Sequence, residues 1–286
     1  MNHLRYRLEF LLFRLVAGLA VLLPLEAASG LSGWLWRLIA PWLKRHRRAL
    51  AHLQLAFPDL TEAERERIAR DMWETLGRVF AESFHLTELA ASDRIVIEDE
   101  AALRAMLAPT NGFVACAAHQ GNWEIAVVGL ARLGYRTAGI YQRIKNPYVD
   151  EMARRLRAPL YPDGLFPKQP ATALTLLRHV RNGGVLSIMA DLRETRGVKV
   201  PFFGRPAPST PFPALIAVTQ NKPLFAAQVI REPGVRFRIS MRPVEVSRTG
   251  DREADIAATT ARLQAMFEES IRARPDQWMW GHKRWG

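Results

Sequence analysis

The sequence contains very little cysteine: Cys116 is the single one among 286 residues. One thiol excludes an intramolecular disulfide and any metal site made of several cysteines, and it favours a reducing compartment. The H-E-x-x-H, CxxC and EF-hand patterns are absent as well, so we expect neither a metal ion nor another cofactor. A G-x-S-x-G nucleophile elbow is also missing.

Acidic residues are fewer than basic ones, with 28 Asp and Glu against 40 Lys and Arg and a net charge of +12. This excess favours acidic partners: nucleic acid, anionic lipid headgroups, phosphorylated substrates or an acidic carrier protein. Nucleic acid is the least favoured of these, because the basic residues are dispersed and form no recognition motif. The 49% content of hydrophobic residues argues against disorder and fits a globular enzyme or a peripheral membrane protein.

The N-terminus lacks a long apolar run. The uncharged stretch Leu15–Leu25 has 11 residues, whereas a full membrane span needs roughly 20. Glu9 and Arg14 interrupt a pattern that otherwise resembles a secretory signal peptide. Tryptophans at positions 34, 36 and 42 precede the basic cluster Lys44–Arg48, an arrangement that suits the headgroup region of an anionic leaflet.

We therefore expect residues 1–45 to form a retained, helical, membrane-associated segment, and residues 46–286 to form a single α/β domain. The segment is either a short tilted span or a helix lying in the membrane plane, with the basic cluster on the cytoplasmic side. The alternative is an ordinary amphipathic helix that packs on the protein's own core. Helices continue to about residue 90, and one of them starts at a capping-box spacing between Thr61 and Glu64.

Beyond residue 90, short apolar runs alternate with helical patterns, which predicts an α/β fold with a mostly parallel central sheet flanked by helices. The expected strands cover residues 112–119, 135–142, 185–191, 223–232 and 235–246, and the expected helices cover 122–134, 146–157, 170–184, 209–220 and 252–274. The carboxyl ends of parallel strands share one edge of a sheet. His119, Gln142, Arg143 and Asp191 all follow such strands, so we expect them at that edge.

His119 and Glu124 form the first candidate catalytic pair. An imidazole titrates near neutrality and can take a proton from an alcohol, provided that one ring nitrogen is free and the other is held by a carboxylate. Glu124 follows five positions later and could hold the ring. Asn122 lies at the start of the following helix, where backbone N–H groups could stabilise an oxyanion. Spacing alone leaves open a structural histidine beside a solvated glutamate.

Five segments, taken together, resemble the lipid A biosynthesis (lauroyl/myristoyl) acyltransferase family, which carries an H-x-x-x-x-[DE] signature. The resemblance extends from about residue 5 to the last residue. The segments are HQGNWE, LAFPDLTEAERERIAR, YQRIKNPYVDEMARRLR, MADLRETRGVKVPFFGRPAPSTPFPALIA and PDQWMWGHKRWG.

The resemblance implies transfer of a fatty acyl chain from acyl carrier protein to a hydroxyl of a lipid A precursor, at the cytoplasmic face of the inner membrane. In that family His119 corresponds to the general base and Glu124 to the group that orients it. The alkoxide attacks the thioester directly without an acyl-enzyme, which agrees with the missing nucleophile elbow. The implied partners are acyl carrier protein, a phosphorylated glycolipid acceptor and the anionic membrane surface.

One position departs from the family pattern. Gln142 stands where an arginine is expected, and Arg143 follows one place later. Neighbouring strand residues face opposite ways, so Arg143 replaces the missing side chain only if it lies in the loop beyond the strand. Asp191 and Arg193 are further candidates for substrate contact. The alternative for Asp191 is a helix-cap or loop-bracing role, and the alternative for Arg193 is a solvated loop.

Other functions fit the same motifs. The acceptor could be an ornithine lipid, another glycolipid or a lysophospholipid, and the donor could be acyl-CoA. A thioester hydrolase would use His119 to activate water. A membrane scaffold without catalytic activity would use neither His119 nor Glu124.

Overall fold

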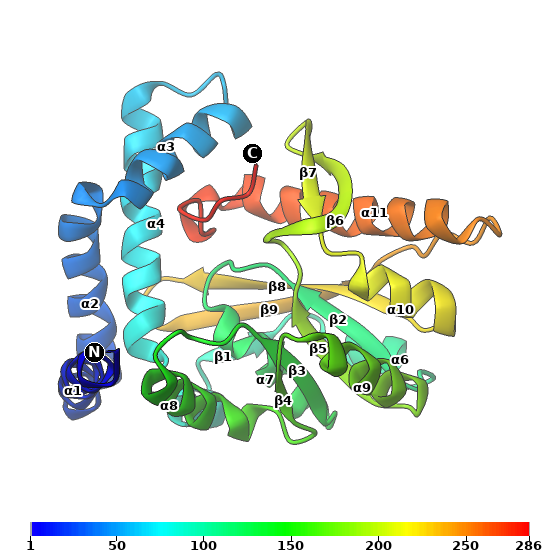
Figure 1. Ribbon diagram of the computed structural model, residues 1–286, viewed down its shortest axis with the longest axis horizontal. Helices are drawn as coiled ribbons and strands as arrows, with labels where there is room; N and C mark the ends of the chain where they lie inside the picture. Colours follow the sequence, from blue (N-terminus) through cyan, green and yellow to red (C-terminus); the bar gives the residue numbers. More distant parts are fainter. Residues whose placement is uncertain (1, 286) are drawn as a thin grey trace.

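A seven-stranded sheet forms the centre of the protein, with the strand order β1-β9-β8-β2-β5-β3-β4 (Figure 1). The computed structural model describes residues 2–285. Neighbouring strands are parallel except for β8 and β9, which pair antiparallel. The predicted α/β fold with a mostly parallel sheet is therefore confirmed. The strands are Ile95–Ile97 (β1), Phe113–Ala117 (β2), Thr137–Tyr141 (β3), Leu165–Pro167 (β4), Val185–Met189 (β5), Leu224–Glu232 (β8) and Arg236–Pro243 (β9).

Strand β2 runs through the middle of the sheet and is buried on both faces. Phe113 and Ala115 join one apolar cluster, with α6 and α7, while Val114 and Cys116 join another, with α9, α10 and α11. A strand covered by helices on both sides needs apolar residues at every position, which is why β2 reads as a continuous apolar run. The covering helices are Glu100–Leu107 (α6), Ala126–Arg132 (α7), Pro170–Arg181 (α9), Phe212–Gln220 (α10) and Arg252–Ala273 (α11).

The N-terminal helices stand beside the sheet. Helix α2 packs along α4, and α1 contacts α2 and α8 (Figure 1). The predicted capping box of α4 is confirmed, because Thr61 Oγ1 accepts the Glu64 N–H and Glu64 accepts the Thr61 N–H. These helices are Asn2–Leu22 (α1), Leu25–Ile39 (α2), Lys44–Ala56 (α3), Glu62–Glu82 (α4), Leu86–Ala91 (α5) and Pro147–Arg157 (α8). Single 3₁₀ turns cover Ala40–Trp42, Trp123–Ile125, Ala158–Leu160 and Pro275–Gln277.

Many apolar side chains of α1 and α2 face solvent. Within residues 2–285, no helix combines the length and the apolar character that crossing a membrane would require. The membrane association of residues 1–45, and the boundary between this segment and the α/β domain, stay predictions. The exposed set comprises Leu4, Leu8, Leu11, Leu12, Leu15, Val16, Leu19, Val21, Leu22 and Leu23, followed by Leu31, Trp34, Leu35, Leu38, Ile39, Trp42 and Leu43.

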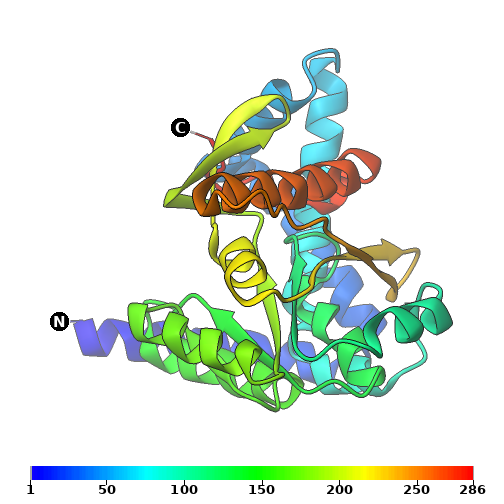
Figure 2. The same ribbon diagram turned by 90° about the vertical axis from the view of Figure 1, so that its right-hand side faces the viewer.

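A hairpin of two antiparallel strands was not expected from the sequence. Strands β6 (Arg193–Phe202) and β7 (Arg205–Ser209) lie on α11, which separates them from α10 (Figure 2). Phe202 and Phe203 at the hairpin turn are buried among three tryptophans of the C-terminal segment, Trp278, Trp280 and Trp285. These two phenylalanines are therefore part of the core.

Candidate active site

His119 and Asp191 meet because their strands are neighbours in the sheet. Ala117 of β2 is in register with Met189 of β5, and each of the two side chains follows its strand by two residues. The imidazole Nδ1 lies 2.7 Å from Asp191 Oδ1, and the backbone N–H of His119 donates to Oδ2 at 3.0 Å. The expected grouping of strand-end residues at one edge thus produces a direct contact between these two.

Asp191 is fully buried and takes part in three hydrogen bonds. Its Oδ2 also accepts a hydrogen bond from the Trp278 indole at 2.7 Å. Burial alone would raise the pKa of the carboxyl, but the adjacent His119 and the hydrogen bonds from His119 and Trp278 lower the pKa below its ordinary value. An ionised Asp191 accepts a proton donor at Nδ1, which leaves Nε2 of the neutral ring as the basic nitrogen.

The free side of the His119 ring can receive a substrate. Nε2 makes no hydrogen bond with any residue between 2 and 285, and the side chain is 18% exposed. The Trp123 ring lies beside it, with the ring centroids 5.3 Å apart. A base held at Nδ1 and open at Nε2 is the geometry that proton transfer from a hydroxyl requires.

Glu124 does not hold the imidazole, which corrects the expected His119–Glu124 contact. Its carboxylate instead receives two hydrogen bonds from Arg157 at the end of α8, at 2.6 and 2.5 Å. Glu124 sits in the 3₁₀ turn that precedes α7 and is nearly buried. The carboxylate that contacts the imidazole is Asp191, and the expected substrate contact of Asp191 stays a prediction. A catalytic contribution of Glu124 stays a prediction.

The Asn122 side chain is also turned inward. Its amide donates to Glu82 at 2.8 Å, and its carbonyl oxygen accepts the N–H of Glu124 at 3.1 Å. Glu82 further binds Arg231 through two hydrogen bonds at 2.9 and 2.6 Å and accepts one from Ser29 at 2.6 Å. Asn122 is fully buried, so its side chain braces the loop, and its expected role in substrate binding stays a prediction.

Gly121 lets the loop that carries His119 approach strand β8. Its φ angle is +60°, and a Cβ at this position would lie 2.3 Å from the carbonyl oxygen of Val229. Its N–H donates to the carbonyl oxygen of Gln277 at 3.0 Å. The loop is thereby fixed between β8 and the C-terminal segment, so a side chain at position 121 would displace His119.

The other predicted substrate residues lie apart from the His119–Asp191 pair. Gln142 and Arg143 are exposed in the loop after β3, which is separated from β2 by β5. Arg193 begins the hairpin strand β6. None of the three forms a hydrogen bond with His119 or Glu124 in the described chain. The arginine that reaches the site is Arg157, not Arg143, and a substrate role for Gln142, Arg143 and Arg193 stays a prediction.

A cavity of about 240 Å³ opens beside the loop that follows His119. Its apolar walls come mainly from α4, with Trp36 of α2, and its polar lining includes the Glu124–Arg157 pair. The lining residues are Trp36, Arg45, Trp73, Leu76, Val79, Phe80, Ser83, Trp123, Glu124, Arg157, Met279, Gly281 and His282. No group of three or more potential metal ligands occurs within residues 2–285.

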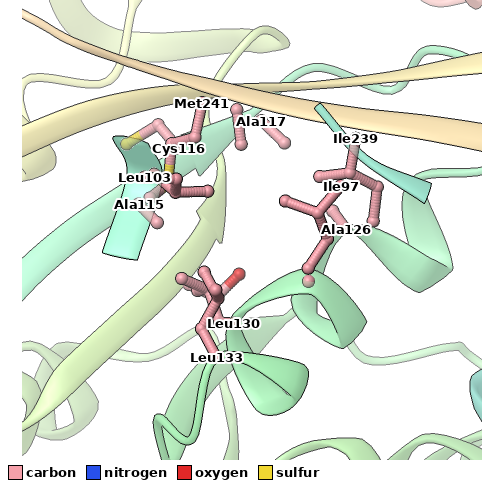
Figure 3. A pocket seen from close by; sticks show the side chains of 13 residues that line it. Ile97, Leu103, Ala115, Cys116, Ala117, Ala126, Leu130, Leu133, Ile239 and Met241 are labelled. Carbon is pink, nitrogen blue, oxygen red and sulfur yellow. The ribbon is translucent and has the colours of Figure 1, made fainter. Parts of the chain in front are cut away.

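A second pocket lies away from this edge, between the sheet and α7 (Figure 3). Ala115 and Cys116 of β2 and Leu130 and Leu133 of α7 are among its lining residues. Its volume is about 10 Å³, roughly what one water molecule needs. It is a packing defect and not a substrate site.

Comparison with known proteins identifies the family. Residues 1–286 match the family described as bacterial lipid A biosynthesis acyltransferase. The chain belongs to this family. It is similar to the phosphatidylinositol mannoside acyltransferases of Mycobacterium tuberculosis strains H37Rv and CDC 1551. Each is 28% identical over 223 residues, which cover 74% of this chain and 68% of the relative. The protein is therefore an acyltransferase.

Several residues that build the site of this acyltransferase escaped sequence reasoning. Arg157 is 33 positions from Glu124, and Glu82 is 149 positions from Arg231. No local spacing connects such partners. Trp278 lies in a segment that resembles the family pattern, but its contact with Asp191 spans 87 positions and depends on the fold.

Proposed function

We propose that this acyltransferase moves a fatty acyl chain from acyl carrier protein to a hydroxyl of a phosphorylated glycolipid, a lipid A precursor, at the cytoplasmic face of the inner membrane. The observation that carries the proposal is His119, which is held by buried Asp191, is open at Nε2 and lies beside Trp123, a residue that lines the cavity. Membership of the lipid A acyltransferase family supports the acceptor class.

The proposed reaction begins at Nε2 of His119, which takes the proton of the acceptor hydroxyl. The oxygen attacks the thioester carbonyl carbon, and the carbon–sulfur bond of the resulting tetrahedral intermediate breaks. The leaving thiolate takes the proton back from the imidazolium, so the products are an ester and the free carrier thiol. Asp191 stabilises the imidazolium, and Arg157, held by Glu124, supplies positive charge for the oxyanion.

The exposed apolar residues of α1 and α2 support membrane attachment in this proposal. Monomeric soluble proteins rarely expose a large contiguous apolar surface, which normally marks an interaction site. The nearby basic cluster Lys44–Arg48 suits anionic headgroups. A lipid acceptor delivered at that surface could reach a cavity whose wall includes Trp36 of α2.

A second acceptor class has specific support. The similar proteins of M. tuberculosis are named for phosphatidylinositol mannoside, a mannosylated phospholipid. An acceptor of that kind would use the same base and the same donor chemistry. Mass spectrometry of all polar lipids from cells with and without the protein separates the two. Loss of one secondary acyl chain from lipid A supports the proposal, whereas an intact lipid A with an altered glycophospholipid contradicts it.

The reaction class is tested with purified protein. Wild-type protein and His119→Ala receive an acyl carrier thioester with and without the acceptor lipid. We expect ester formation only with acceptor, and a loss of roughly 10³-fold or more in His119→Ala at unchanged thermal stability. Release of free fatty acid that does not depend on acceptor would instead identify a hydrolase.

A further inference from the structure

The basic residues at the start of α3 lie on different faces of the helix. Arg45 and Arg48 are three positions apart and therefore share one face of the helix. Arg45 lines the cavity, and its Cβ lies near Gly281, while Arg48 donates to the carbonyl oxygen of Gly281 at 3.3 Å. Lys44 and Arg47 are exposed and do not line the cavity. Arg45 and Arg48 are exposed as well, so this face of the cluster meets both the edge of the cavity and solvent.

This corner of the cavity has cations without counter-ions. Arg45 and Arg48 form no salt bridge among residues 2–285, and neither does the neighbouring Lys283. The two nearby carboxylates are already engaged, since Glu124 binds Arg157 and Asp191 binds His119. An unpaired guanidinium at the edge of a cavity attracts an anion, and a planar guanidinium fits a phosphate through two hydrogen bonds.

His282 is the third side chain at this part of the cavity. It lines the same cavity, and burial lowers the pKa of its imidazole, as do the charges of His119, Arg45 and Arg48, although Asp191 opposes them. A neutral imidazole can donate one hydrogen bond to an anion, and a bound anion would offset the positive field around it. The charges of the two arginines and the imidazole of His282 therefore influence the same part of the cavity.

We propose that Arg45, Arg48 and His282 bind a phosphate group of a substrate where the cavity meets solvent. The inference rests on the proposed function for the substrates themselves, since both carry phosphate: the pantetheine arm of the donor as a diester, and the glycolipid acceptor as its headgroup. Apolar walls from α4 then take the attached chain, and the reacting carbonyl lies toward Trp123 and His119.

The first test is a set of double-mutant cycles between Arg45→Ala and removal of each phosphate. The donors are acyl-phosphopantetheine and acyl-pantetheine, and the acceptors are the lipid A precursor and its phosphatase-treated form. If the donor phosphate binds here, Arg45→Ala raises the KM of the phosphorylated donor by about tenfold and that of acyl-pantetheine by about twofold or less. The same pattern with the acceptor pair assigns the acceptor phosphate.

The control is Arg181→Ala, which removes an exposed arginine on α9 that does not line the cavity. It should leave both KM values unchanged. Equal effects of Arg45→Ala on the phosphorylated and dephosphorylated forms, in both cycles, overturn the proposal. A KM increase in Arg181→Ala as large as that in Arg45→Ala also overturns it, because the effect would then reflect net charge.

A binding measurement keeps the inference separate from the proposed function. Phosphopantetheine and pantetheine are titrated into wild-type protein while the His282 imidazole resonance is followed by NMR. We expect phosphopantetheine to bind at least about tenfold more tightly than pantetheine, and this preference to disappear in Arg45→Ala. If the protein moves no acyl chain to lipid A precursors, the proposed function fails, and this preference still decides the phosphate site. Equal binding of the two ligands, together with additive cycles, rejects it.

Discussion

Strand β2 and helix α1 are both rich in apolar residues, but their surroundings differ completely. Every residue of β2 is buried between helices of the same chain, whereas Leu12 and Leu22 of α1 are 64% and 82% exposed. The apolar character of β2 is explained by packing inside the protein. That of α1 is not, and the membrane attachment proposed above would account for it. Polar residues differ as well: Asn122 and Glu124 after β2 are buried and paired, whereas Arg45 and Arg48 of α3 are exposed and form no salt bridge within residues 2–285.

The largest effect is expected at the carboxyl ends of the buried strands, where two carboxylates have different partners. Asp191→Asn places an amide against the ring N–H, the His119 N–H and the Trp278 indole, so we expect kcat to fall by roughly 10³- to 10⁴-fold. Glu124→Gln weakens only the pair with Arg157 and should reduce kcat less. Steady-state kinetics of both variants measures the difference. A Glu124→Gln enzyme slower than Asp191→Asn would return the orienting role to Glu124.

A stability effect is expected at Gly121. Alanine there would combine a φ of +60° with a Cβ 2.3 Å from the Val229 carbonyl oxygen, so β8 and the loop must separate. We expect a loss of roughly 2–4 kcal/mol in the free energy of unfolding, measured by urea denaturation. Gly134→Ala is the matched control, because it has a φ of +91° but no atom within 4 Å. It should lose only about 1 kcal/mol. Equal losses would mean that the close approach to β8 is unimportant.

A charged substitution on the exposed face of α1 tests the role of that helix. Leu12→Glu should weaken binding to anionic phospholipid vesicles by about tenfold or more, because a charge replaces an apolar contact with the bilayer. The unfolding free energy should change by no more than about 0.5 kcal/mol, since the side chain has little contact inside the protein. Leu174→Glu on α9, where Leu174 is 52% exposed, provides the control and should bind vesicles normally. Equal vesicle binding by all three proteins would refute membrane docking through α1.

The smallest effect concerns α3, which packs on α4. Burial lowers the pKa of His52, and also that of His282 in the C-terminal segment. The unfolded chain therefore binds protons more readily, and stability should be full above about pH 6.5 and decline as the pH falls below that value. Asp191, with a lowered carboxyl pKa, contributes its part above about pH 4 and does not change in this window. Calorimetry between pH 8 and pH 5 should show a flatter profile for His52→Gln, and an unchanged slope would contradict this.

The alternation of strands and helices could be predicted from the sequence because each buried strand of the sheet is a short apolar run. The hairpin β6–β7 could not. Its residues mix charges with Pro201, Pro206 and Pro208, and its register shifts between Arg193 and Val198. The strands are stabilised by pairing with each other and by packing on α11, and neither interaction leaves a periodic pattern.

The candidate site was predictable to the same degree. The position of His119 and Asp191 at one sheet edge follows from their places after two strands. Which carboxylate meets the imidazole depends on β2 and β5 being neighbours, and strand order is not written in local spacing. The five-residue spacing from His119 to Glu124 therefore placed both residues in one loop but indicated the wrong hydrogen bond.

The reactivity of Cys116 can report how often the sheet opens next to His119. The thiol is fully buried in β2, three positions before His119, and burial raises its pKa, so it is unreactive while the sheet is closed. As the single cysteine of the chain, it makes the rate of alkylation by a small thiol reagent a measure of how often the sheet separates at the catalytic loop. Ligands that stabilise the site should slow that rate, so binding can be followed without a substrate that turns over.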